Sequence, residues 1–303
     1  MESKRRNKKA PVLATVLSFV ALLVVLIFQG DNISDYLDRA ARSDFHYTKG
    51  TVAVHFIDVG QGSSTLIQSG NQGILIDAGE RDYAQTVTDY IKTSGVKTLT
   101  YVVASHPHSD HIGAMADVLD AIPTENVIMP QLTESNTPTT SCYERLLKSI
   151  QKNKIKAYAA KFGKTYRIDH AQIELLGPLV QDDDLNNMSV VCKLTAFDTT
   201  FMLLADADKP ELRTICNTNA QLKSDIILMG HHGSSKALYY SFLNRVNAKV
   251  AVVSCGLKND YGHPHKETVK YIKDNHMEFY RTDLQSHIVF ICDENGYQIQ
   301  TAA

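Results

Sequence analysis

The chain has 303 residues and a formal net charge of −2, with 44% hydrophobic and 21% charged residues. These values are typical of a folded protein with one large or two small domains, whose core needs no disulfide or metal to hold it. Residues 1–10 carry a net charge of +4, which leaves −6 for the rest, so the composition excludes a strongly basic nucleic-acid-binding domain. The five cysteines form no Cys-x-x-Cys pair, and neither a disulfide framework nor a structural zinc site is expected.

The first fifty residues are predicted to anchor the chain in a membrane. Residues 1–10 form a basic cytoplasmic tail, and the uncharged run 11–28 is a transmembrane signal-anchor, since its length reaches the lower limit of a spanning helix, about 17–25 residues. Residues 29–50 form a polar stalk. Because positive flanks stay cytoplasmic, we expect a single-pass protein of the cell membrane with an extracytoplasmic domain. Secretion after signal cleavage is the alternative, although the residues after the run offer a poor cleavage site.

From residue 51 onward, strands and helices are interspersed. Apolar periodicity and turn signals predict strands at 52–59, 64–68, 73–76, 99–104, 165–168, 171–176, 189–196, 200–204, 225–229 and 250–254, and helices at 81–94, 112–122, 209–218, 236–246 and 265–274. Asn295-Gly296 predicts the turn of a final hairpin, because such turns need positive φ. One α/β domain at 51–303, with two sheets flanked by helices, fits this order, and other α/β arrangements share it.

Four residues of metal-ligand type lie within six positions: His106, His108, Asp110 and His111. They follow a predicted strand and precede a predicted helix. In extended backbone, His106 and His108 point the same way, whereas Asp110 and His111 begin the helix and face a second point nearby. Imidazoles with a carboxylate favour zinc, manganese or iron over calcium or magnesium. A polar loop with chance histidines is the alternative.

The sequence His-x-His-x-Asp-His resembles the metal-binding motif of the metallo-β-lactamase superfamily of metallohydrolases. Further motifs resemble the hydrolase domain of ComEC-type competence proteins, and they lie at residues 56–62, 74–79, 186–189, 203–208, 229–235, 260–265 and 280–283. Ser63 and Ala205 depart from the aspartate and glycine of the family pattern. The resemblance spans about residues 51–292 and implies an αββα sandwich of two mixed sheets flanked by helices.

The resemblance implies two divalent metal ions, zinc or manganese, and no organic cofactor. Asp206 is implied as the carboxylate that bridges both ions, with capping of the following helix as the competing interpretation. Asp110, His111 and His232 complete the second site, and Asp110 also belongs to the implied catalytic residues. His231 is implied to contact substrate or to donate a proton to the leaving group, and the two adjacent histidines could exchange roles.

The first site is implied to hold His106, His108 and Asp206. Superfamily members usually add a histidine upstream of the bridging aspartate, but this chain has Asn187 in that region. Asn187 is therefore a candidate weak metal ligand or substrate contact. We expect the first site to bind metal less tightly than the second, or to prefer manganese over zinc.

Three further features have both a functional and a structural interpretation. Asp77 is implied to orient the histidines of the metal-binding loop, or it only caps a turn. His263 is implied as a catalytic residue that meets a phosphate oxygen or the leaving group, or it caps the helix after Pro264. The stretch from Arg145 to Arg167 contains eight basic residues and no acid, and it either guides a polyanion or forms a solvated face.

These features predict a metal-dependent hydrolase. The implied reaction is cleavage of a phosphodiester, in DNA or a cell-surface polymer, outside the membrane and through a metal-bound hydroxide. An amide or lactone hydrolase of the same fold and a non-catalytic binding module are the alternatives. The sequence contains no glycine-rich phosphate loop and no Gly-x-Ser-x-Gly, so the metals would have to supply the nucleophile.

Overall fold

The structure is a computed structural model that describes Phe45 and residues 47–302. The predicted basic tail and membrane anchor, and most of the predicted stalk, lie outside the described residues. Among the described residues, no helix combines the length and the apolar character that a membrane crossing requires.

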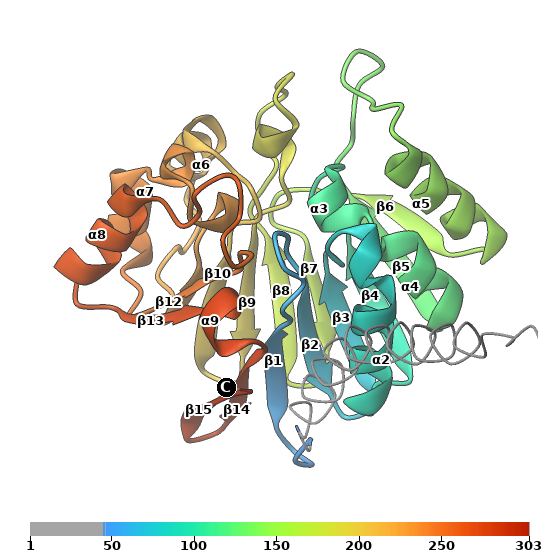
Figure 1. The fold of residues 1–303 in the computed structure, drawn as a ribbon, viewed down its shortest axis with the longest axis horizontal. Coiled ribbons are helices and arrows are strands. Elements are labelled where there is room, and N and C mark those ends of the chain that lie inside the picture. The colour runs from blue at the N-terminus through green and yellow to red at the C-terminus, as the bar shows by residue number, and fades with distance from the viewer. Residues whose placement is uncertain (1–44, 46, 303) are drawn as a thin grey trace, which may run out of the picture. The chain divides into compact units, whose positions relative to one another are not determined.

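Two mixed sheets form the centre of the described chain (Figure 1). The first has the order β15-β14-β1-β2-β3-β4-β5-β6, and it is antiparallel up to β3 and parallel beyond. Its strands are β1 (Val52–Phe56), β2 (Thr65–Ser69), β3 (Gln72–Ile76), β4 (Thr98–Val103), β5 (Thr124–Met129), β6 (Lys156–Ala159), β14 (Ile288–Asp293) and β15 (Gly296–Thr301).

The second sheet likewise has an antiparallel part, from β7 to β10, and a parallel part, from β10 to β13. Its order is β13-β12-β11-β10-β9-β8-β7, and the strands from β10 to β13 are parallel. The strands are β7 (Thr165–Ile168), β8 (Ala171–Leu175), β9 (Cys192–Ala196), β10 (Thr199–Leu203), β11 (Ile226–Leu228), β12 (Val250–Val253) and β13 (Glu278–Arg281).

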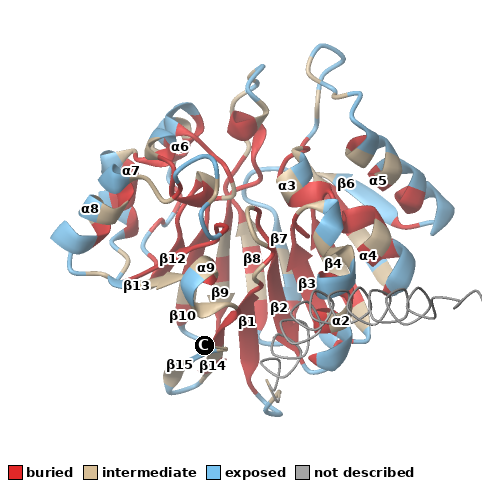
Figure 2. Ribbon diagram, viewed as in Figure 1, coloured by how far each residue is buried: buried red, intermediate tan, exposed pale blue. Residues whose placement is uncertain are grey.

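Helices cover the outer face of each sheet (Figure 1). On the first sheet lie α2 (Ala84–Thr93), α4 (Met115–Ala121) and α5 (Ser141–Lys152), and on the second lie α6 (Lys209–Cys216), α7 (Tyr240–Val246) and α8 (Lys266–Asp274). Each helix buries its inward side and exposes its outer side (Figure 2). The expected αββα sandwich is therefore confirmed.

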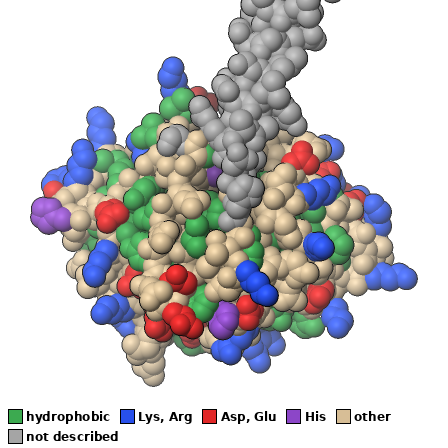
Figure 3. Space-filling model, turned by 90° about the horizontal axis from the view of Figure 1, so that it is seen from below, with side chains coloured by type: hydrophobic (Ala, Val, Ile, Leu, Met, Phe, Trp, Pro, Cys, Tyr) green, Lys and Arg blue, Asp and Glu red, His purple; other side chains and the backbone are tan. Residues whose placement is uncertain are grey.

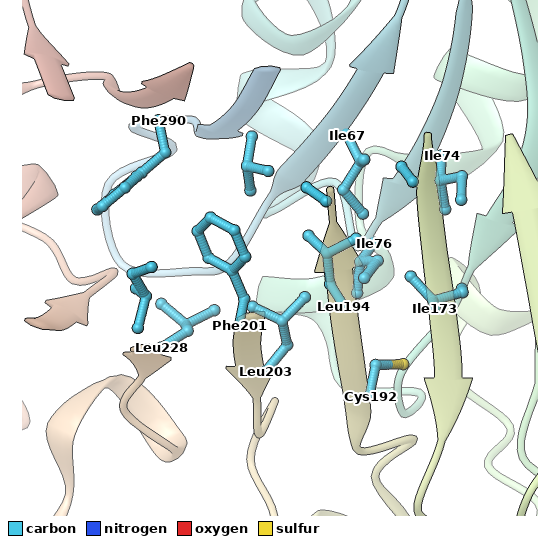
Figure 4. Packing of buried hydrophobic residues seen from close by; sticks show 14 of the residues in the cluster. Ile67, Ile74, Ile76, Ile173, Cys192, Leu194, Phe201, Leu203, Leu228 and Phe290 are labelled. Atoms are coloured by element: carbon cyan, nitrogen blue, oxygen red, sulfur yellow. The ribbon is translucent and has the colours of Figure 1, made fainter. Parts of the chain in front are cut away.

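The inner faces of the two sheets meet in one apolar layer. Ile67, Ile74 and Ile76 of the first sheet face Ile173 and Leu194 of the second (Figure 4). At the other end of the layer, the rings of Phe56, Phe201 and Phe290 pack with centroids 5.5–6.5 Å apart. Burial of this alternating apolar set sets the spacing of the sheets, and with it the positions of the strand ends.

Several predicted elements differ from the structure in their bounds or in detail. The predicted helix 112–122 is two helices, α3 (Ser109–Ile112) and α4, because Ala114 N donates to Gly79 O at 3.0 Å instead of continuing the helical pattern. The predicted strand 189–196 begins only at Cys192, since Val190 N donates to Ser105 O at 2.9 Å. The final hairpin is confirmed, but positive φ occurs at Gly296 and not at Asn295.

Glu211 is a fully buried acid in α6 that is outside the candidate site. Its carboxylate accepts hydrogen bonds from Leu179 N at 2.8 Å and Val180 N at 3.0 Å. Burial nevertheless raises the pKa of Glu211 from 4.5 to about 7. Since the folded chain holds this proton more tightly than the unfolded chain, the associated stability is fully present below pH 4.5 and is lost as pH rises through about 7.

We predict that Glu211→Gln removes this pH-dependent loss. The free energy of unfolding of the wild type minus that of the variant should fall by up to about 3 kcal/mol between about pH 5 and about pH 7.5. Urea unfolding at both pH values measures the difference. The exposed Glu267→Gln is the matched control and should leave it nearly constant, and a constant difference for Glu211→Gln would contradict the prediction.

Candidate metal centre

The candidate ligands gather where strands of both sheets end. In the first sheet, β3 leads to Asp77 and β4 leads to the loop with His106 and to α3. In the second sheet, β10 leads to Asp206 and β11 leads to His232. Because these strands belong to the parallel parts of the two sheets, their carboxyl ends lie at one edge of the sandwich, beside α3 in Figure 1.

Asp77 fixes the orientation of the histidine loop. Its Oδ1 accepts from Ser105 N at 2.8 Å, and its Oδ2 accepts from Ser105 Oγ at 2.6 Å and from His111 Nδ1 at 2.7 Å. The Ser105 hydroxyl thus donates its only hydrogen to Asp77, and its oxygen accepts a hydrogen bond from His106 Nδ1 at 3.1 Å. Both histidines therefore use Nδ1 to donate these hydrogen bonds, and Nε2 is the ring nitrogen that each directs toward the candidate metal position.

Four residues converge tightly enough to hold one cation. Asp110, His111, Asp206 and His232 each offer a ligand atom, and these atoms lie within 4.8 Å of one another. His111 Nε2 is 3.1 Å from Asp206 Oδ1, and both atoms are buried without a hydrogen-bond partner among the described residues. Buried polar atoms that lack partners are costly, and a divalent cation between them would satisfy both. Imidazole nitrogens with carboxylates are donors that zinc and manganese accept.

Asp206 presents its second oxygen to another group of histidines. Its Oδ2 is 3.9 Å from His106 Nε2 and 3.8 Å from His231 Nε2, whereas its Oδ1 faces His111 and His232. His106 Nε2 is also 3.0 Å from His108 Nδ1. One carboxylate oxygen is therefore directed to each side, which is the arrangement that a bridging ligand needs.

The charges of the centre depend on one another. Burial acts to raise the pKa of Asp110, but the hydrogen bond with His232 and the neighbouring His111 hold that pKa well below its usual range. Burial also opposes a charge on His111, yet the carboxylates of Asp206 and Asp77 raise its pKa well above normal. For His106, burial and the neighbouring His111 lower the pKa well below normal. Asp110 thus stays ionised and ready to bind a cation.

His231 and His232 are adjacent in sequence and have different partners. His232 Nδ1 donates to Ser254 O at 2.9 Å, so its Nε2 is free to face Asp110 at 3.0 Å. His231 Nδ1 bonds Asp208 Oδ1 at 3.1 Å, and His231 is outside the four-residue cluster. Burial lowers the pKa of His231, but the Asp208 contact outweighs it and raises the pKa above normal.

The backbone at these two histidines is strained. His231 has φ of 51° and His232 has φ of 53°, in the left-handed region that costs such residues about 1–3 kcal/mol each. The next residue must be Gly233, since a Cβ there would lie 2.7 Å from Pro264 Cβ. His231 N donates to Ala205 O at 2.8 Å and so holds the turn against the loop that carries Asp206.

A cavity of about 530 Å³ opens beside the centre. Its wall includes the predicted residues His108, Asp110, Asp206, His231, His232 and His263. The sequence predictions did not include Gln61, Asn186 and Tyr261, which also line it. Gln61 lies in a Gly-Gln-Gly sequence that predicted only a turn after a strand. Asn186 precedes Asn187, which was the predicted site residue.

The two adjacent asparagines lie differently with respect to the cavity. Asn187 Nδ2 donates to Asp182 Oδ2 at 2.9 Å, and Asn187 is not part of the cavity wall. Asn186 lines the cavity. The side-chain oxygens of both residues are buried without a hydrogen-bond partner among the described residues. Ser189, two residues further on, accepts from Asp206 N at 3.2 Å through Oγ.

The part of the long basic stretch that lies on α5 is partly paired with acids from α4. Arg145 donates to both oxygens of Asp117 on α4, at 2.7 and 2.6 Å. Lys152 Nζ is 2.8 Å from Asp120 Oδ2. The lower face of the molecule likewise shows acidic and basic side chains interspersed (Figure 3). A solvated, ion-paired face describes α5 better than a track for a polyanion.

The sequence model of the metallo-β-lactamase superfamily matches residues 57–256, and the chain belongs to this superfamily. The Bacillus subtilis ComE operon protein 3 is 24% identical over 256 residues, which cover 78% of this chain and 32% of that protein. The Neisseria gonorrhoeae competence protein ComA is 27% identical over 299 residues, which cover 96% of this chain and 40% of that protein. The resemblance to ComEC-type competence proteins is confirmed, and the chain spans about a third of the length of these relatives.

Solved structures support the same fold. The metallo-β-lactamase fold protein YhfI of Bacillus subtilis aligns with a TM-score of 0.50 and 14% identity, over 80% of this chain and 99% of that one. Igni18, a metallo hydrolase from Ignicoccus hospitalis, aligns with a TM-score of 0.51 and 14% identity, over 78% of this chain and 98% of that one. At such identities the likeness establishes the fold alone.

We predict that Asp77→Asn weakens zinc binding by about 10–100-fold, because the amide cannot accept from Ser105 and His111 together. Competition with a chromogenic chelator measures the affinity. Asp225→Asn is the matched control, since Asp225 accepts from Thr200 N and Thr200 Oγ1, at 3.0 and 2.7 Å, away from the centre. Equal losses in both variants would mean general destabilisation and contradict a specific role for Asp77.

Proposed function

We propose that this chain is a binuclear metal-dependent phosphodiesterase. It acts outside the membrane, as the expected anchor at residues 11–28 implies, on DNA or a cell-surface phosphodiester. The observation that carries the proposal is the convergence of Asp110, His111, Asp206 and His232, with partnerless buried donor atoms, at the wall of an open cavity. The competence proteins among the relatives support DNA as the substrate.

The ligand assignment follows the two sides of Asp206. Asp110, His111, His232 and Asp206 would hold one ion, and His106 and His108, with Asp206 shared, would hold the other. Because His232 donates from Nδ1 to Ser254 O and directs Nε2 to Asp110 Oδ2 at 3.0 Å, its position supports His232, rather than His231, as the ligand. Asp77 orients His111 through a direct hydrogen bond and His106 through Ser105, which is the orienting role that the resemblance implies for it.

The bound metals would supply a nucleophile at neutral pH and neutralise charge on the attacked phosphorus. The chain's own residues bind and orient the substrate around that point. His231, which Asp208 holds at Nδ1 and whose pKa is raised, carries a proton toward the cavity and donates it to the leaving oxygen. Arg81, an exposed cation in the cavity wall, attracts the anionic substrate.

The histidine-rich wall, with Arg81, favours a phosphodiester over an amide or lactone. Arg81 and the imidazoles of His231 and His263 present hydrogen-bond donors that match phosphoryl oxygens. The amide or lactone hydrolase remains the second candidate because the fold and the metal ligands alone serve either reaction. A non-catalytic binding module would have no need of the proton-bearing His231 beside the centre.

We predict that the full-length chain, loaded with manganese or zinc, hydrolyses bis-p-nitrophenyl phosphate and single-stranded DNA but not a chromogenic β-lactam. Asp110→Ala should lower the rate by more than about 100-fold, since loss of an orienting partner alone costs about 10–100-fold. Asp225→Asn should keep the wild-type rate. Turnover of the lactam alone would favour the second candidate, and silence on all three substrates with metal bound would favour the binding module.

The two metal sites are expected to differ in affinity. The first site has two histidines and one shared carboxylate oxygen, whereas the second has two histidines and two carboxylates. Mild chelation should therefore remove one equivalent of zinc well before the other, as atomic absorption of the dialysed chain would show. Release of both equivalents together would contradict this ligand assignment.

A further inference from the structure

One side chain that the metal centre does not use is held between the two sheets beside the cavity. Gln61 follows β1, and its Oε1 accepts a hydrogen bond from Gly256 N at 3.1 Å. Its Nε2 is 3.3 Å from His263 Nδ1. Because a backbone N–H can only donate, the oxygen of Gln61 must face Gly256. The amide nitrogen must then face His263.

This contact determines where His263 carries its hydrogen. An amide N–H donates and cannot accept, so His263 Nδ1 must be the unprotonated acceptor. The single hydrogen of the neutral ring is then on Nε2. Among the described residues, Nε2 takes part in no hydrogen bond, and His263 lines the cavity. The ring therefore presents an N–H donor to whatever occupies the cavity.

We propose that Gln61 is a positioning residue that fixes the Nε2–H tautomer of His263 and so makes it a neutral hydrogen-bond donor to the substrate. His263 then donates a hydrogen bond and not a proton, because loss of the Nε2 hydrogen would leave an imidazolate. The matching substrate atom is an anionic or carbonyl-type oxygen. In the proposed reaction, on which this assignment of the acceptor rests, that atom is a non-bridging phosphoryl oxygen.

His231 and His263, which both line the cavity, thus have different tasks. His231 is bonded to an acceptor, the Asp208 carboxylate, which supports a proton on the ring. His263 is bonded to a donor, the Gln61 amide, which opposes a second proton. Their rings lie 5.7 Å apart between centroids, so one substrate can meet both.

The surroundings hold His263 in place for this role. Asn259 Nδ2 donates to Gly256 O at 2.8 Å and to His263 O at 2.7 Å, and Asn259 Oδ1 accepts from His263 N at 2.9 Å. Tyr261 stacks on the His263 ring, with centroids 5.6 Å apart and planes 17° apart. A Cβ at Gly256 would lie 2.7 Å from Gln61 N, so only glycine permits the approach that fixes the amide.

Nitrogen-15 NMR of the zinc-loaded full chain with labelled histidine tests the tautomer directly. The His263 signals are assigned by their loss in His263→Gln. The wild type should show the Nε2–H pattern at His263. In Gln61→Glu, one carboxylate oxygen still accepts from Gly256 N while the other faces Nδ1, so the pattern should change to hydrogen on Nδ1. A wild-type Nδ1–H pattern, or an unchanged pattern in Gln61→Glu, overturns the proposal.

Kinetics with a phosphodiester test whether the tautomer matters to turnover. Gln61→Glu should lower kcat by about 10²–10³, the usual effect of losing one donor to developing charge, with KM little changed. Gln298→Glu, on exposed β15, adds the same charge elsewhere and should keep the wild-type kcat. An unchanged kcat despite a changed tautomer overturns the role in turnover. If the wild type cleaves no phosphodiester, the NMR result still decides the tautomer, so failure of the proposed function is distinguishable.

Discussion

The metal centre depends on the acceptance of three hydrogen bonds by one buried carboxylate. Asp77 binds the backbone and hydroxyl of Ser105 and the Nδ1 of His111, and Ser105 in turn accepts from His106. Two imidazoles on either side of Asp206 are thereby oriented through one side chain. An ionised carboxylate is suited to this task because it only accepts hydrogen bonds. An imidazole that donates to it from Nδ1 must therefore direct its Nε2 away from it.

The packing of the two sheets sets the distances within the centre. Asp110 and His111 come from the first sheet, whereas Asp206 and His232 come from the second. Within the part of the chain that belongs to the first sheet, close backbone contacts hold Asp110: Ser63 N donates to Asp110 O at 3.0 Å, and a Cβ at Gly62 would lie 2.6 Å from the same oxygen. The aspartate that the family pattern expects at position 63 is a serine here, and the backbone contact does not depend on that side chain.

The strands, the helices and the histidine-rich loop could be predicted from local signals in the sequence, such as the spacing of His106, His108, Asp110 and His111. The αββα arrangement and the roles of Asp206 and His232 were implied by the resemblance to the metallo-β-lactamase superfamily. Other features depend on the tertiary structure. Asp117 neutralises Arg145 from another helix, and Gln61 reaches His263 across 202 positions of sequence. The periodicity of a sequence does not reveal contacts between distant residues. For the same reason, it could not show that Asn186 rather than Asn187 lines the cavity.

The division of the ligands between the sheets has a consequence for folding. Neither half of the chain contains a complete site, so a cation can be held tightly only after the sandwich has closed. A ligand that binds the closed state alone adds free energy of about 2.7 kcal/mol at a hundred times its dissociation constant. Bound metals would then link the two sheets to each other. Their removal would lower the free energy needed to separate the two halves of the sandwich.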